Sequence, residues 1–269
     1  MPASPGYSVQ DLLRVMQRLR DPQLGCPWDL EQDFASIVPS TLEEAYELVE
    51  AIEQQDYPHL AEELGDLMFQ VVFYAQLGQE RELFDFEQVV SGLVDKLVRR
   101  HPHVFADGQI EGVVESKTSI AGVKQSWEAI KQQERHARSQ ASVLDDIPLT
   151  LPALSRAQKV QKRVANVGFD WPDSSGVLAK IAEELQEFKE AAGETRERQE
   201  EELGDLIFSC VNLARHTGVD AEAALRRATR KFEQRFTQVE QRVVNNGGEL
   251  QDTPLAELDQ IWDAVKQDA

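Results

Sequence analysis

The fold of this chain is decided by a stretch that occurs twice. It reads EELGDLMFQVVFYAQL at residues 62–77 and EELGDLIFSCVNLA at residues 201–214. In both copies the residues after the first acids are apolar around most of a helix's circumference, which is the pattern of a buried helix. An unpaired buried carboxylate costs several kcal/mol. We therefore expect Asp66 and Asp205 to be buried beside a partner, and a cation in each copy is the simplest one.

The repeat extends over nearly the whole chain. Matching motifs keep their order while the offset between the copies drifts only from 141 to 135. They are Leu13, Gln17, Arg18 and Leu19 with Leu154, Gln158, Lys159 and Val160, Trp28-Asp29 with Phe169-Asp170, Glu43-Glu44-x-x-Glu47 with Glu183-Glu184-x-x-Glu187, Lys96 and Arg100 with Lys231 and Arg235, and Trp127 and Lys131 with Trp262 and Lys266. The sequence predicts two tandem homologous helical-bundle domains, residues 1–136 and 151–269, joined by a linker at 137–150.

The remaining pattern is helical almost throughout. Apolar residues recur at helical spacing, and the pairs Ser8 with Asp11 and Thr41 with Glu44 are typical of helix starts. Further helices are expected from Pro58 to about residue 77 and at about 86–100, 116–136, 152–166, 174–192, 196–216, 220–245 and 254–267. A short hairpin arm is expected only from Ile110 to Val114. The predicted fold class is therefore all-α.

The charge of the chain excludes several classes of partner. Its 269 residues include 28 Lys and Arg but 48 Asp and Glu, so the net charge is −20. Nucleic-acid polymers and anionic membranes are bound through Lys and Arg, so neither is an expected partner. Two cysteines, Cys26 and Cys210, are too few for a disulfide framework, and the N-terminus shows no basic and apolar leader. We expect a cytoplasmic protein.

Each repeat carries Glu-x-x-Glu on one expected helix and Glu-x-x-Asp on the next. Residues three apart share a helical face, so two facing helices can direct four carboxylates into one space. Such an oxygen-rich site suits a hard divalent cation, Mg²⁺ or Mn²⁺. Gly65 and Gly204, inside these helices, favour the close approach of a helix or a ligand. The alternative for the first Glu pair is a solvated acidic face.

Absent and present motifs together narrow the chemistry. The chain has no GxxxxGK[ST] and no GxGxxG, and its acidic helices have no Glu-x-x-His, which disfavours a di-iron site. Cations and a Trp follow the acids, as Lys231, Arg235, Trp262 and Lys266 in the second repeat. A carboxylate–metal centre beside such residues suits a phosphorylated ligand with a ring, a nucleotide. The alternative is a surface ion-pair helix with a core Trp.

At this point the motifs resemble a known family. EExxE followed by ExxD resembles the MazG-type nucleoside triphosphate pyrophosphohydrolases, and GCPWD at 25–29, RRHPHVF at 99–105, NVGFDW at 166–171 and the tandem repeat resemble its two-domain bacterial members. The resemblance implies a helical bundle that dimerises, needs Mg²⁺, and converts a nucleoside triphosphate such as ATP and water into a monophosphate and pyrophosphate, as a broad house-cleaning activity. By position it implies metal ligands at Glu184, Glu187, Glu202 and Asp205, with counterparts at Glu44, Glu47, Glu63 and Asp66.

Local charge favours the second domain as the catalytic one. Residues 43–66 hold nine acids and no Lys or Arg, whereas residues 183–205 hold ten acids and three cations. A triphosphate is bound through such cations. We expect Glu183 or Glu201 to act as the general base, and Lys180 and Arg198 to bind phosphate. Lys231, Arg235 and Lys266 are expected to bind phosphate and to stabilise the transition-state charge. Trp262 or Trp171 is expected to stack on the base.

Two other functions stay open on the sequence alone. One is a phosphohydrolase that releases orthophosphate, which product analysis distinguishes from a pyrophosphohydrolase. The other is a non-enzymatic helical module for interaction or nucleotide sensing, whose acidic face is exposed and indifferent to Mg²⁺. Base and sugar preference are not set by these motifs.

Overall fold

The computed structural model describes residues 6–114 and 142–267, together with residues 119, 120, 122, 123, 126, 127, 130 and 134. These residues form helices, turns and irregular segments and contain no strand. The predicted all-α class is therefore confirmed, and the hairpin arm expected from Ile110 to Val114 is wrong, because this segment is a turn followed by irregular backbone. Most of the helix expected at 116–136, with Lys131, lies outside the described residues.

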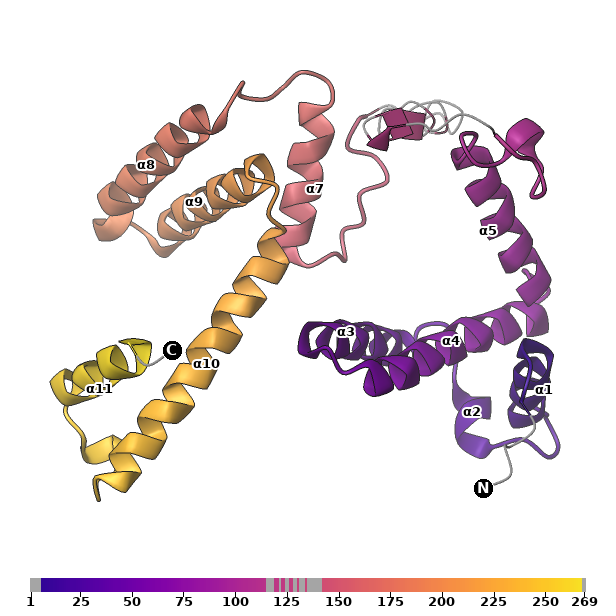
Figure 1. The fold of residues 1–269 in the computed structure, drawn as a ribbon, viewed down its shortest axis with the longest axis horizontal. Helices are drawn as coiled ribbons and strands as arrows, with labels where there is room; N and C mark the ends of the chain where they lie inside the picture. The colour runs from indigo at the N-terminus through magenta and orange to yellow at the C-terminus, as the bar shows by residue number, and fades with distance from the viewer. Residues whose placement is uncertain are drawn as a thin grey trace. The chain divides into compact units, whose positions relative to one another are not determined.

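The chain divides into two compact units, Met1–Glu134 and Arg135–Ala269 (Figure 1). Each unit holds one copy of the repeat. The domain limits and the linker at 137–150 stay predictions.

Unit 1 is built around one long helix, α4, against which α1, α3 and α5 pack. Its elements are α1 (Val9–Leu19), α2 (Pro27–Glu31), α3 (Val38–Gln54), α4 (Tyr57–Glu80), α5 (Phe86–Arg100) and the 3₁₀ turn η1 (Ala106–Gly108). The core cluster consists of Met16, Ile37, Val72, Phe73 and Leu77. It joins α1 to the C-terminal half of α4, so the N-terminal half of α4 is left to pair with α3.

The turn between α3 and α4 makes these helices an antiparallel pair. Gln55 ends α3 in the left-handed conformation, with a φ of 58°. Asp56 then caps α4 by accepting a hydrogen bond from the N–H of His59, and Pro58 occupies its first turn, where a missing N–H costs nothing. Because the turn is so short, the acids of α3 lie opposite those at the start of α4.

The two capping pairs predicted in unit 1 had different outcomes. Ser8 and Asp11 form both bonds of a capping box at the start of α1, as predicted. Thr41 does not open α3, which begins one turn earlier at Val38 with a proline in its first turn. The Thr41 hydroxyl instead donates to the carbonyl of Ile37 or to the Tyr74 hydroxyl, so it serves as a contact between α3 and α4.

Unit 2 repeats the acidic helix pair and adds a second pair. Its elements are α7 (Ala153–Ala165), α8 (Ser174–Glu190), η2 (Ala191–Gly193), α9 (Arg196–His216), α10 (Ala221–Asn245), η3 (Leu250–Asp252) and α11 (Leu255–Gln267). α8 packs against α9, α9 against α7, and α11 against α10. The core of the α10–α11 pair is formed by Val239, Val243 and Val265. The acids and the later cations of the repeat therefore lie on different helix pairs.

One face of α4 and one face of α9 are open to solvent, contrary to the expectation of buried helices. Leu64, Met68 and Val71 on α4 and Leu203, Ile207 and Phe208 on α9 are 43–51% exposed. Asp66 and Asp205 are exposed with them, so their predicted burial is wrong. The open space beside Gly65 and Gly204 likewise contradicts a close helix contact there.

The described helices include none that is both long enough and apolar enough to span a membrane.

Candidate functional site

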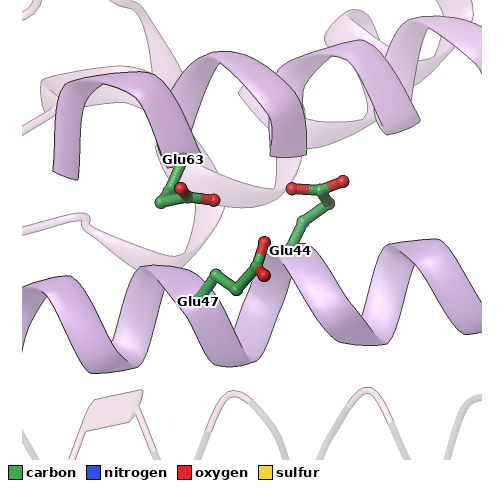
Figure 2. Close-up of side chains that lie close together, drawn as sticks. All are labelled: Glu44, Glu47 and Glu63. Carbon is green, nitrogen blue, oxygen red and sulfur yellow. The ribbon is translucent and has the colours of Figure 1, made fainter. Parts of the chain in front are cut away.

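The acids of unit 1 converge between α3 and α4. Glu44 and Glu47, one turn apart on α3, point toward Glu63 of α4, as Figure 2 shows. One carboxylate oxygen from each of the three lies within 4.8 Å of the others. Asp66 does not belong to this group, although its charge reaches Glu44. Three of the four acids predicted to share this space therefore bring their oxygens this close together, and the four-ligand set stays a prediction.

Mutual repulsion marks this cluster. The pKa of Glu44 is raised, first by desolvation and then by the charges of Asp66, Glu47 and Glu63. The pKa of Glu47 is raised by desolvation and by Glu63, against a smaller opposing effect of His59. A divalent cation would remove this repulsion, since an opposite charge favours the ionised form of each carboxyl.

Glu63 is the most buried member of the cluster. It is 6% exposed, and its Oε1 lies 2.6 Å from Nε2 of His59. Its other oxygen, Oε2, is buried and has no hydrogen-bond partner among the residues that the structure describes. Buried carboxylate oxygens normally have partners, so this atom is suited to a ligand that the protein does not supply.

The acids of unit 2 converge in the same way between α8 and α9. Oxygens of Glu184, Glu202 and Asp205 lie within 4.8 Å of one another. Glu184 and Glu202 are 4% and 2% exposed, so the buried acids are glutamates rather than the aspartate. Glu187 lies outside this group, but desolvation and the charges of Glu184 and Glu202 raise its pKa. Within the described part of the chain, Oε2 of Glu184 has no partner.

Two cations distinguish unit 2 from unit 1. Nζ of Lys180 lies 2.7 Å from Glu184 and 2.8 Å from Glu183. Arg198 pairs with Glu202 and, at 2.8 Å, with Glu201. These contacts raise the pKa of both cations, with the hydrogen bonds to Glu183 and Glu201 as the largest causes. Each buried glutamate of unit 2 is thus partly neutralised by a cation one turn before it.

The two candidate general bases are the exposed partners of these cations. Glu183 is 57% exposed in its ion pair with Lys180, and Glu201 is 63% exposed in its pair with Arg198. Each directly precedes a buried acid of the cluster, Glu184 or Glu202, in the sequence.

The later cations and Trp262 are placed on the α10–α11 pair. The rings of Trp262 and Phe232 lie 5.1 Å apart, and Lys266 pairs with Asp263 at 3.0 Å. Lys231 is exposed and Arg235 half-buried on α10. These four residues therefore lie on α10 and α11, whereas the acid cluster lies on α8 and α9.

The counterparts in unit 1 form a local network of their own. Arg100 pairs with Glu134, which Arg99 also contacts, and the hydrogen bond from Arg100 is the main cause that lowers the pKa of Glu134 to about 2. The ring of Trp127 stands edge-on to His101 at 5.1 Å. Lys96 is exposed on α5.

Trp171 lines a cavity that the sequence did not predict. This cavity has a volume of about 540 Å³, which is in the range of small-molecule sites, and lies between α7, α9 and the loop that joins α7 to α8. Its walls include Gln161, Phe169, Trp171, Phe208 and Asn212. Nearby, Arg215 and His216 bond to Asp170 and lower its pKa to about 2. The only sequence signal for this network was the match of Phe169-Asp170 to Trp28-Asp29.

Two segments of the chain, residues 32–105 and 173–240, match the family of the MazG nucleotide pyrophosphohydrolase domain. The chain belongs to the MazG family. Each MazG segment contains one acid cluster, whereas Trp171 and Trp262 lie outside both segments.

Two relatives show how far the MazG likeness extends. Over 262 residues the chain is 51% identical to the nucleoside triphosphate pyrophosphohydrolase of Escherichia coli (strain K12), covering 96% of this chain and 97% of that protein. Over 261 residues it is 44% identical to the nucleoside triphosphate pyrophosphohydrolase/pyrophosphatase MazG of Thermotoga maritima, covering 97% and 96%. The crystal structure of a mazG-related protein from Thermotoga maritima covers 46% of this chain and 98% of that chain at 27% identity, with a TM-score of 0.38 that is too low to bear on the fold.

The donor atoms of both MazG segments fit a metal ion. Carboxylate oxygens are the ligands that hard divalent cations prefer. In each cluster a glutamate with little exposure, Glu63 or Glu184, carries a buried oxygen that no described residue satisfies. A divalent cation would satisfy both orphaned oxygens in the same manner.

Proposed function

We propose that this chain is an Mg²⁺-dependent nucleoside triphosphate pyrophosphohydrolase whose catalytic site is the acid cluster of unit 2. Family membership and the names of the two relatives, which match nearly the whole chain, support this activity. The observation that carries it is the cluster of Glu184, Glu202 and Asp205, whose carboxylates each bring one oxygen within 4.8 Å of the others, and in which Glu184 also has a buried oxygen without a partner among the described residues. The products are a nucleoside monophosphate and pyrophosphate.

In this proposal Glu184, Glu187, Glu202 and Asp205 hold the metal. Bound Mg²⁺, or Mn²⁺ in its place, withdraws charge from phosphate oxygens and lowers the pKa of a bound water. Glu187 joins the three clustered acids because the charges of Glu184 and Glu202 already act on it. The corresponding set in unit 1 is Glu44, Glu47, Glu63 and Asp66.

Lys180 and Arg198 have two roles in succession. Without metal they neutralise Glu184 and Glu202. When these carboxylates bind a divalent cation, their hold on the two side chains weakens, and both cations become available to the triphosphate. Unit 1 has Ser40 and His59 at the equivalent positions, at offsets of 140 and 139. This difference supports unit 2 as the unit that binds the polyanionic substrate.

Glu183 or Glu201 accepts the proton of the attacking water. Both are exposed, and each directly precedes a proposed ligand in the sequence. Each is freed when its cation, Lys180 or Arg198, turns to phosphate, so loss of the ion pair and availability of the base occur together. General-base catalysis of this kind contributes about 10²–10⁴-fold.

Lys231, Arg235 and Lys266 are proposed to bind phosphates and stabilise the transition-state charge, and Trp262 or Trp171 to stack on the base. Because these residues lie on α10, on α11 or before α8, whereas the acid cluster lies on α8 and α9, we propose that a second copy supplies the α10–α11 pair to the acids. We therefore also propose a homodimer formed through the exposed apolar faces of α4 and α9, which are described above. Nucleic-acid polymers are not proposed partners, and the cytoplasm stays the proposed location.

Product analysis tests the proposed activity directly. Purified chain is incubated with standard, deoxy and altered nucleoside triphosphates in Mg²⁺ or EDTA, and pyrophosphate, orthophosphate and monophosphate are quantified. Equal amounts of pyrophosphate and monophosphate, only with Mg²⁺, are expected. Orthophosphate as the first product would instead indicate a phosphohydrolase. No product, with thermal stability unchanged by Mg²⁺ and a non-hydrolysable nucleotide, would favour the non-enzymatic module.

A further inference from the structure

His59 and Arg198 occupy the same place in the two repeats. They lie 139 residues apart, which is the offset of the EELGD motif itself. Each pairs with the glutamate four positions later, His59 with Glu63 and Arg198 with Glu202. Both glutamates are among the least exposed charged residues that the structure describes, at 6% and 2%. The two acid clusters therefore differ in the side chain that reaches this buried glutamate.

This difference changes the ligands available to a metal. A guanidinium has five donors, no acceptor, and stays protonated in proteins, so Arg198 cannot coordinate a cation. A neutral imidazole is the commonest nitrogen ligand of metals. It shifts the preference of a carboxylate site toward Mn²⁺, Co²⁺ or Zn²⁺, because Mg²⁺ takes oxygen ligands almost exclusively.

The geometry at Glu63 is suited to such a site. Nε2 of His59 lies 2.6 Å from Oε1 of Glu63, close to the roughly 3 Å that separates neighbouring ligands of one ion at bond lengths of about 2.1 Å. The second oxygen of this side chain is buried and unpartnered within the described structure. Oxygens of Glu44 and Glu47 lie within 4.8 Å of the Glu63 carboxylate.

We propose that unit 1 binds a first-row transition-metal dication through Glu44, Glu47 and Glu63, with His59 as a nitrogen ligand. The direct contact between His59 and Glu63 is then replaced by coordination of both side chains to one ion. The two units thus differ in their proposed ligand sets, with a nitrogen ligand in unit 1 and oxygen ligands alone in unit 2. The unit 1 site concerns metal binding alone and stands whether or not unit 2 releases pyrophosphate.

Pulsed EPR of bound Mn²⁺ tests this site, since coordinated imidazole gives a ¹⁴N modulation that carboxylates do not. The full chain carries Glu184→Gln and Glu202→Gln, which remove the unit 2 cluster with little change of shape. Without nucleotide, we expect one tightly bound Mn²⁺ per chain with ¹⁴N modulation. Adding His59→Gln should abolish the modulation and weaken Mn²⁺ binding about 10-fold or more, with much less effect on Mg²⁺. Adding Glu63→Gln should remove the bound Mn²⁺.

The reciprocal change gives a second readout in case a unit 1 variant does not fold. In a chain with Glu63→Gln, the substitution Arg198→His should introduce ¹⁴N modulation at the unit 2 site, and Arg198→Gln should not. Circular dichroism confirms the fold of every variant. The proposal is overturned by Mn²⁺ bound in unit 1 without ¹⁴N modulation, by modulation that survives His59→Gln, or by the absence of bound Mn²⁺ in unit 1.

Discussion

Arg198 forms an ion pair with the buried carboxylate of Glu202, one turn later on α9. The arginine side chain is 45% exposed while that of the glutamate is 3% exposed, so the cation lies at the protein surface and its carboxylate partner is buried in the acid cluster. Lys180 pairs with Glu184 in the same way on α8. In unit 2 the charge of the acid cluster is thus partly balanced by two cations.

Removing Arg198 should therefore lower stability more without metal than with it. In EDTA, Arg198→Ala leaves Glu202 buried without its cation and should cost about 1–2 kcal/mol of stability, below the full value for a buried pair because Arg198 is half-exposed. Saturating Mg²⁺ should restore most of this loss, while KM for the nucleotide rises. Thermal melts in both conditions measure the effect.

The matched control for this variant is Arg196→Ala. Arg196 also pairs with a glutamate four positions later, but both side chains are largely exposed, at 87% and 65%. Such a pair contributes little, so neither stability nor KM should change. Equal destabilisation by the two variants would contradict the role given to Arg198.

The acids of unit 2 should be essential and those of unit 1 dispensable for catalysis. Glu184→Ala or Asp205→Ala should abolish Mg²⁺-dependent pyrophosphate release, because each removes an oxygen of the proposed metal site. Glu44→Ala removes the equivalent oxygen of unit 1 and should leave most of the activity. Steady-state pyrophosphate assays on folded variants measure both. If Glu44→Ala were the inactivating change, the catalytic site would belong to unit 1.

The helices and the acid clusters were predictable because each depends on local sequence. In unit 2, Thr195 and Asp220 cap α9 and α10, and the predicted limits agree with the observed ones within two residues. Spacing of three on facing helices correctly brought Glu184 and Glu202 together. Sequence periodicity reports which residues are apolar but not what covers them, which is why the burial of Asp66 and Asp205 was predicted wrongly.

Other features depended on contacts that no motif records. α3 begins at Val38 rather than at Thr41, whose hydroxyl instead contacts Tyr74, a residue 33 positions away. His59 and Glu63 have a helical spacing that the sequence shows. The buried oxygen of Glu63 that has no partner in the described structure, which makes this pair a candidate for metal binding, is visible only in the structure. The cavity at Trp171 needed α7 and α9 to be placed side by side.

Acid should weaken unit 2 through Asp170. Arg215 and His216 lower its pKa from 3.8 to about 2, so the folded state binds this proton less readily than the unfolded chain. The contribution, about 2 kcal/mol at most, is fully present above the unfolded pKa and is lost as the pH falls through the folded one. Roughly half should be gone near pH 3.

Urea midpoints of Asp170→Asn and the unaltered chain measure this pH dependence. The variant should be less stable near neutral pH, and the gap should shrink as the pH falls from about 5 to about 3. The exposed Asp259 provides the control, since Asp259→Asn should leave the midpoint unchanged at every pH. A gap that stays constant with pH would mean that the substitution at Asp170 removes packing rather than charge.

Self-association should depend on the open apolar face of α9. Ile207 is 45% exposed between Leu203 and Phe208, at the centre of the face that we propose for the dimer. Ile207→Glu would place a charge against apolar surface, and analytical ultracentrifugation should then show at least a 10-fold weaker dimer, about 1.4 kcal/mol or more. Leu255→Glu, at an exposed position that starts α11, is the control and should associate normally. A second copy is proposed to bring α10 and α11 to the acids, so dilution of the Ile207→Glu variant should lower its activity per chain. A monomer that stays active would show that one chain completes the site alone.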